Sequence, residues 1–156
     1  MKRIVRKIIA IIIATFAVYN VLWFTWSHVT YGKFSGGLEE DEFSNFVIPH
    51  YFCMDEDSYN YAVKYPDYLH FTGNMSVGLP VTEEQFFTDS LIIWPKLSGG
   101  YEFGALLYDE DGIAYQIYID YNGKALSKED EGVISRHSDN ISTLLKKADE
   151  KWHIRD

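Results

Sequence analysis

The sequence predicts an α+β protein: an N-terminal transmembrane helix, then a small antiparallel β-meander of about four strands packed against a C-terminal amphipathic helix. Three observations support this fold class. Residues 8–26 form an uncharged apolar run that follows four cations. Residues 68–121 contain short aromatic and branched segments separated by turn residues, a pattern typical of consecutive strands. Residues 127–153 then change to the three- and four-residue spacing of a helix.

The apolar run 8–26 has the length of a membrane-spanning helix. Its 19 residues would rise about 28 Å as an α-helix, close to the ~30 Å hydrocarbon layer of a bilayer. The indoles of Trp23 and Trp26 favour the headgroup level, so they mark one end of the span. The lipid bilayer is therefore the first expected partner. The anchor residues that we expect are Ile8, Ile12, Phe16, Leu22, Trp23 and Trp26.

The distribution of cations predicts the orientation of this span. All four cations of residues 1–7 precede the run, whereas the thirty residues that follow it carry one, Lys33. Lysine and arginine are retained on the cytoplasmic side of a membrane. We therefore expect a cytoplasmic basic segment at 1–7, a single-pass signal anchor at 8–26 in the cell membrane, and an extracytoplasmic C-terminal domain.

A cleaved signal peptide is the alternative. Such a peptide has an apolar core of about 7–15 residues and a cleavage site flanked by small residues. The segment Thr25–Ser27 has a bulky Trp at its centre, and the segment Thr30–Gly32 lies well beyond the apolar run. The length of the run and the poor cleavage sites favour an anchor that is not cleaved.

Beyond the anchor, the composition predicts a polar spacer at 27–42 and one extracytoplasmic domain at 43–156. The spacer contains the pair Gly36 and Gly37 and several acidic residues, which is typical of a flexible linker. The domain has the size of an ordinary single folding unit. Its one cysteine, Cys53, excludes an internal disulfide, and an extracytoplasmic domain without disulfides indicates a bacterial protein.

The strands are expected in the middle of the chain, where turn residues alternate with apolar segments. The clearest signal is Asp111-Gly112, which predicts a tight hairpin because glycine accepts the positive φ of such a turn. In residues 113–121 apolar and more polar side chains alternate, so one face should pack on the core. The expected strand segments are 68–78, 90–95, 101–108 and 113–121.

Residues 127–153 predict the amphipathic helix. Ser127 followed by Asp130 resembles a capping arrangement at the helix start, and Gly132 or Ser138 marks a point where the segment would divide into two helices. The apolar stripe should cover the inner face of the sheet. Its members are Ile134, Ile141, Leu144, Leu145, Ala148 and Trp152.

The charge balance excludes one class of function and favours another. All 23 acidic residues but only 10 of the 14 lysines and arginines lie beyond the apolar run, which gives the outer domain a net charge of about −13. Such a field repels nucleic-acid phosphates, so nucleic-acid binding is excluded. A basic protein or peptide is the partner that this charge favours.

Tyrosines supply the candidate binding surface. Residues 43–68 are dense in aromatics, with side chains at a period of two that fit either a strand or, after an acidic start, a short helix. Each buried tyrosine hydroxyl needs a partner, so we expect some of these rings at the surface as a recognition patch; a core built from large rings is the alternative. The candidate binding residues are Tyr59, Tyr61, Tyr65 and Tyr68.

Calcium is the one cofactor that the sequence raises. Asp120, Asn122, Gly123 and Glu129 match positions 3, 5, 6 and 12 of a calcium-binding loop. Tyr118 stands at the first ligand position, where a carboxylate is required. A simple turn explains the same residues without a metal.

No catalytic motif is present in the sequence. The five histidines are scattered and form no metal-binding spacing. We therefore expect a membrane-anchored binding or interaction domain without catalytic activity, its nearest variant being an inhibitor or immunity-type protein at the membrane surface. An extracytoplasmic hydrolase is the alternative, with unmarked carboxylates and one of His50, His70 or His137. A structural component of a larger membrane complex is a third.

Overall fold

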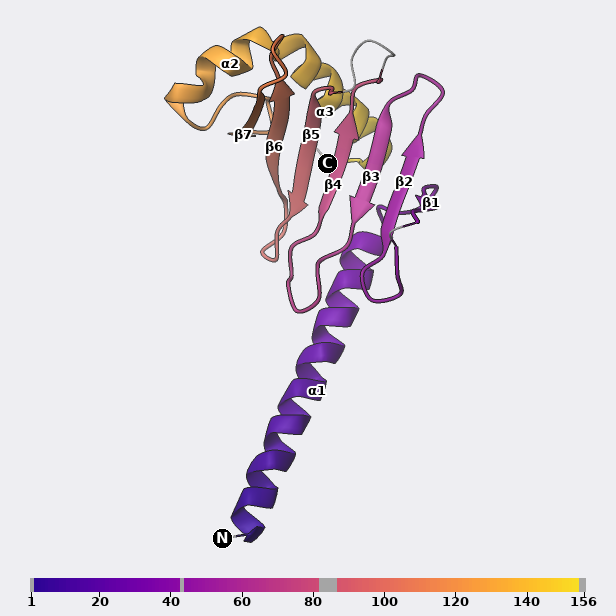
Figure 1. The fold of residues 1–156 in the computed structure, drawn as a ribbon, viewed down its shortest axis with the longest axis vertical. Helices are drawn as coiled ribbons and strands as arrows, with labels where there is room; N and C mark the ends of the chain where they lie inside the picture. The colour runs from indigo at the N-terminus through magenta and orange to yellow at the C-terminus, as the bar shows by residue number, and fades with distance from the viewer. Residues whose placement is uncertain (1, 43, 82–86, 155–156) are drawn as a thin grey trace.

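The protein is a long helix that carries a helix-covered sheet at its C-terminal end (Figure 1). The structure is a computed structural model that describes residues 2–42, 44–81 and 87–154. Helix α1 (Lys2–Gly32) comes first. The sheet follows, and the chain ends with a short 3-10 helix η1 (Lys128–Asp130), helix α2 (Glu131–Arg136) and helix α3 (Ser138–Trp152).

The sheet is an antiparallel meander in which each strand pairs with the next one along the chain. The α+β class is confirmed, but the described part of the chain has seven strands where the sequence predicts about four. The additional pairing comes from the aromatic segment before residue 68 and from two acidic residues without a strand pattern of their own. The strands are β1 (Glu39–Glu40), β2 (His50–Met54), β3 (Asn60–Lys64), β4 (Asn74–Gly78), β5 (Ser90–Pro95), β6 (Tyr101–Tyr108) and β7 (Ala114–Ile119).

The core lies between one face of the sheet and α3. Alternate residues of the strands are buried, as the period of two requires, and α3 lies against β4 and β5. The predicted amphipathic helix is confirmed: its residues Ile141, Leu144, Leu145, Ala148 and Trp152 are buried. The sheet contributes Tyr61, Val63, Met75, Val77, Leu91, Ile93, Phe103, Ala105, Leu107, Ile117 and Ile119.

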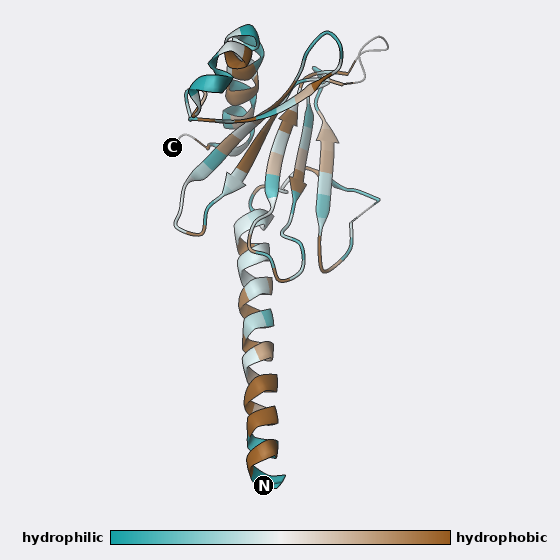
Figure 2. Cartoon of the chain, turned by 60° about the vertical axis from the view of Figure 1, so that its left-hand side comes forward, coloured by the Kyte–Doolittle hydropathy of each residue, from teal (hydrophilic) through white to brown (hydrophobic). Residues whose placement is uncertain are grey.

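Helix α1 has an exposed apolar part and a packed part. Within the described ranges it is the one helix long and apolar enough to cross a membrane, and its hydropathy falls towards the sheet (Figure 2). Trp23, Ser27 and Tyr31 recur every four residues and are buried, because this spacing places them on one helix face. The helix therefore extends to Gly32, through part of the segment 27–42 that the sequence assigns to a spacer.

The antiparallel order places alternate connections at opposite ends of the sheet. The connections 41–49, 65–73 and 96–100 lie at the end where α1 joins the domain (Figure 1); we call them the anchor-side loops. The connections 55–59 and 109–113 lie at the other end, which we call the distal end.

Candidate functional site

The β3–β4 loop is hydrogen-bonded to three successive turns of α1. Tyr19 Oη, Trp23 Nε1 and Trp26 Nε1 donate to the backbone carbonyls of Leu69, His70 and Phe71 in turn, over 3.0, 2.5 and 3.2 Å. Each donor lies three or four residues after the previous one, so the loop follows the axis of the helix. This contact fixes α1 to the domain.

The polar side chain of Asn20 also joins this contact. Tyr68 Oη donates to Asn20 Oδ1 over 2.5 Å, and Asn20 Nδ2 donates to the Phe16 carbonyl over 2.8 Å. The Tyr68 ring meets the Trp23 indole edge-on, with centroids 5.2 Å apart. The one amide in the apolar run is therefore satisfied inside the protein.

The last turn of α1 reaches the core and links both ends of the chain. Tyr31 is fully buried, and its hydroxyl oxygen accepts a hydrogen bond from the Gly73 amide over 2.7 Å. Two residues after the helix ends, the Phe34 carbonyl accepts a hydrogen bond from Trp152 Nε1 of α3 over 3.0 Å. Helix α1 is thus a structural part of the domain.

The expected anchor residues divide between these two parts of α1. The large apolar side chains nearer the N-terminus, Ile8, Ile12, Phe16 and Leu22, are exposed. Trp23 is 2% exposed and Trp26 is half-buried against the β3–β4 loop. Both indoles therefore contact the domain.

The four candidate binding tyrosines do not share one surface. Tyr61 and Tyr65 are buried, at 4% and 3% exposure, whereas Tyr68 is 44% exposed beside α1. Tyr59 is half-buried, with its ring 4.5 Å from Lys147 Nζ of α3. The structure places Tyr65 and Tyr68 near α1 and Tyr59 and Tyr61 near α3.

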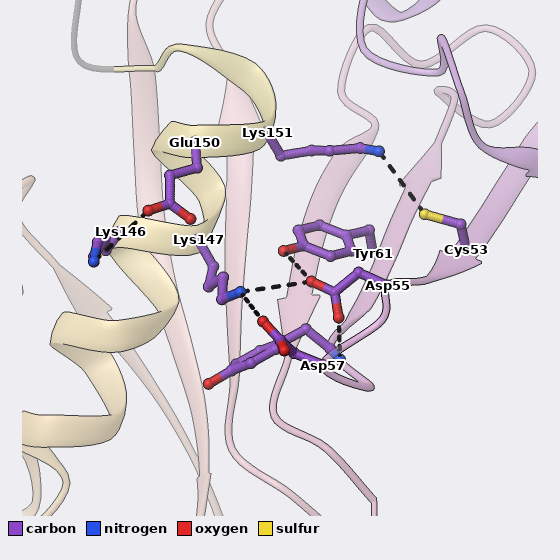
Figure 3. Close-up of polar contacts among 9 residues, drawn as sticks. Cys53, Asp55, Asp57, Tyr61, Lys146, Lys147, Glu150 and Lys151 are labelled. Carbon is purple, nitrogen blue, oxygen red and sulfur yellow. Dashed lines mark hydrogen bonds and ion pairs between the residues drawn. The ribbon is translucent and has the colours of Figure 1, made fainter.

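An ion-pair cluster connects α3 to the β2–β3 turn (Figure 3). Lys147 Nζ lies 2.9 Å from Asp57 and 3.7 Å from Asp55. The hydrogen bond to Asp57 is the main reason that the pKa of Lys147 is raised to about 12. Tyr61 donates to Asp55 over 3.1 Å, and burial, together with this bond, raises the pKa of Tyr61 to about 12. These contacts hold α3 on the sheet.

The distal end carries an open groove of about 410 Å³. It is lined by Tyr108, Asp109, Glu110, Asp111, Arg136 and His137, and we call it the distal groove. Three carboxylates in succession give it an acidic wall. The other wall comes from the junction between α2 and α3.

Asp89 supports one wall of the distal groove from inside. It is 5% exposed and accepts hydrogen bonds from His137 Nδ1 over 2.7 Å, Asn140 Nδ2 over 2.8 Å and the Tyr108 amide over 2.9 Å. The sequence reasoning named His137 but not Asp89. Asp89 directly precedes the apolar strand β5, and that position was the only available signal.

The residues matched to a calcium loop form a turn. Asp120 Oδ1 accepts hydrogen bonds from the amides of Asn122 and Lys124, over 2.9 and 2.8 Å. Glu129 lies in η1, where its amide donates to Ser127 Oγ. Among the residues that the structure describes, no three His, Cys, Asp or Glu side chains are grouped to hold a metal ion.

Comparisons with protein-family models, with curated proteins and with solved structures find no match to this chain. Two features of the structure bear on function. The first is the contact between α1 and the β3–β4 loop, and the second is the distal groove with its acidic wall.

Proposed function

We propose that this protein is a single-pass signal-anchored membrane protein that presents a binding domain on the extracytoplasmic side. One observation carries the proposal: Trp23, Ser27 and Tyr31 are buried in the domain, although they belong to the same helix as the apolar run. A signal sequence near the N-terminus can have the same apolar character as this run. Cleavage at Ser27 or Gly32, however, would remove side chains that the folded domain buries.

The binding surface that we propose is the distal groove. It lies at the end of the sheet opposite the anchor-side loops, and Asp109, Glu110 and Asp111 line it. An acidic wall on a domain with a net charge of about −13 favours a cationic segment of a protein or peptide. An inhibitor or immunity-type protein that captures a basic enzyme or toxin at the membrane surface fits this arrangement.

The orientation is tested by protease treatment of intact spheroplasts that produce the full chain with a C-terminal tag. We expect the tag to be removed from the outside while α1 stays in the membrane fraction. Protection of the tag in intact spheroplasts, with removal only after lysis, contradicts the proposed orientation.

The binding site is tested with the full chain in nanodiscs and an oligolysine peptide as the probe. Glu110→Lys should strongly weaken salt-sensitive binding of the peptide, because the carboxylate of Glu110 lines the distal groove. Glu102→Lys is the matched control, since Glu102 is exposed at the anchor end of β6. Equal binding of the peptide by the unmodified chain, the groove variant Glu110→Lys and the Glu102→Lys control contradicts the assignment of the site.

A hydrolase is the second candidate, and one specific observation favours it. His137 lines the distal groove while its Nδ1 is bonded to buried Asp89, which is how a histidine base is oriented in many active sites. Among the described residues His137 makes no hydrogen bond to a side-chain hydroxyl or thiol. Loss of a measured hydrolytic activity in His137→Gln, with peptide binding retained, would favour this candidate.

A further inference from the structure

The anchor-side loops lie beside the outer part of the apolar run itself. Among the described residues, the first hydrogen bond from α1 to the domain comes from Tyr19. Tyr19 precedes Trp26 by seven residues, which is about 10 Å along a helix. The bonded segment of the β3–β4 loop therefore follows α1 over residues 19–26, the last eight of the 19 residues of the run 8–26.

The uncharged helix below that contact is too short to span a bilayer alone. Residues 8–18 are eleven in number and rise about 16 Å, roughly half of the ~30 Å hydrocarbon layer. The remaining thickness must surround the helix from Tyr19 upward. At that level the helix already carries the β3–β4 loop.

Hydrogen bonds within the protein satisfy backbone groups of the β3–β4 loop, as a position at membrane depth requires. Irregular backbone is tolerated at membrane depth only where its polar groups are bonded inside the protein. The carbonyls of residues 69–71 accept hydrogen bonds from α1, and the His70 amide donates to Asp67 O over 2.8 Å. In the β1–β2 loop, Asn45 Oδ1 accepts from the amides of Val47 and Ile48, over 3.0 and 2.9 Å.

Apolar side chains project from all three anchor-side loops. Phe46 is 80% exposed, and its ring centroid lies 5.6 Å from that of Phe24 in α1. Phe46 therefore stands beside the apolar run, with most of its ring uncovered by protein. The exposed apolar residues of the three loops are Phe46, Val47, Tyr68 and Leu97; we call them the seat residues.

Two lysines lie near the same level as Leu97. Lys33 and Lys96 line an open groove of about 350 Å³ between α1 and the β5–β6 turn, together with Trp26 and Leu97. A cation next to an indole and an aliphatic side chain suits the boundary between headgroup phosphates and acyl chains. On the β3–β4 loop, the carboxylate of Asp67 is paired with Lys64 at 3.1 Å.

We propose that the seat residues are immersed in the outer leaflet, so that the domain rests on the bilayer as a rigid body without a flexible spacer. This inference rests on the proposed function, because it requires α1 to span the membrane. The bilayer is the occupant because the seat residues continue the apolar surface of α1. The hydrogen bonds of Tyr19, Trp23 and Trp26 keep the β3–β4 loop at a fixed depth along the helix.

Spin-label accessibility in nanodiscs tests this proposal on the full chain. Phe46→Cys and Leu97→Cys are labelled in a Cys53→Ser background, and collisions with oxygen and with a water-soluble nickel chelate are measured. We expect both labels to shift the accessibility ratio towards oxygen. Ile113→Cys is the matched control, because this exposed apolar residue lies at the distal end and should remain accessible to the chelate.

A label at Phe16 separates the two possible failures. If Phe16→Cys is oxygen-accessible while the labels at Phe46 and Leu97 behave like that at Ile113, the immersed seat is wrong and the anchor stands. If the label at Phe16 is accessible to the chelate, the membrane span itself is wrong, and the seat fails with it. Depth at Phe16, Phe46 and Leu97 with an aqueous Ile113 supports both proposals.

Discussion

The hydroxyl oxygen of Tyr31 accepts a hydrogen bond from the Gly73 amide over 2.7 Å in a buried site. This bond joins the last turn of α1, the helix that carries the apolar run, to Gly73, the residue directly before β4. Cleavage of this segment as a leader would remove a buried residue, Tyr31, from the core of the domain. The contact therefore makes the helix that carries the apolar run a part of the folded core.

Tyr31→Phe should destabilise the domain. The substitution keeps the ring but leaves the buried Gly73 amide without its acceptor, which costs about 1–3 kcal/mol in the free energy of unfolding. Tyr118→Phe is the control, since Tyr118 is exposed, and a change within about 0.5 kcal/mol is expected there. Urea unfolding in detergent micelles measures both. Equal stability of the two variants would mean that the hydrogen bond between Tyr31 and Gly73 does not stabilise the domain.

Ser27→Ala should instead stabilise the protein. Ser27 is fully buried, and its Oγ has no hydrogen-bond partner in the part of the chain that the structure describes. Replacing a buried, unpaired hydroxyl in a helix should raise the free energy of unfolding by about 1 kcal/mol. The exposed Ser142 of α3 is the control, because Ser142→Ala changes helix propensity alone. A destabilising effect of Ser27→Ala would contradict the assignment of Ser27 Oγ as a buried group without a hydrogen-bond partner among the described residues.

Asp89 and His137 should be energetically coupled. Asp89→Ala removes the acceptor of three hydrogen bonds in a buried site, and we expect a loss of about 3–5 kcal/mol in the free energy of unfolding. The double variant with His137→Ala should show an interaction energy of about 1–3 kcal/mol. A double-mutant cycle by urea unfolding measures it. Additive single effects would rule out the support that Asp89 gives to the distal groove.

Stability should fall as the pH rises through the range from 10 to 12. The pKa of Tyr61 is raised from 10.0 to about 12, and that of Lys147 from 10.5 to about 12. The folded protein therefore keeps both protons where the unfolded chain releases them, so the stabilisation present below pH 10 is lost as pH approaches 12.

The thermal midpoint measured across this pH range tests the effect. Tyr61→Phe should lose less stability than the unmodified chain, because the variant lacks one of the two titrating groups. Tyr121→Phe, at an exposed tyrosine, should follow the unmodified chain. A Tyr61→Phe curve parallel to that of the unmodified chain would show that Tyr61 does not contribute to this pH dependence.

The sequence predicted the β6–β7 hairpin and the C-terminal helix, because both depend on residues that lie close together in the chain. The hairpin at Asp111-Gly112 is confirmed, with Gly112 at φ 76° between β6 and β7. The helical stripe also appears as predicted, and the chain divides at Ser138, where α3 begins. In these segments the turn chemistry and the spacing of apolar residues are written into consecutive positions.

Features that depend on partners far along the chain could not be derived in the same way. Strand β1 exists because Glu39 and Glu40 pair with β2. A segment of two residues is too short for an alternating pattern that would predict a strand. The contact of Trp23 with the carbonyl of His70 joins segments 47 residues apart. In β3, Tyr61 and Val63 are buried between half-buried neighbours, and the period of two in the sequence was the signal that these side chains point inward.

The intact mass of the protein in washed membranes tests the central claim most directly. Membranes from cells that produce the chain are washed with alkaline carbonate, and the retained protein is measured by mass spectrometry. We expect the complete chain of 18.1 kDa, because α1 remains both in the bilayer and in the domain. A carbonate-soluble product shortened by its N-terminal segment would contradict this claim.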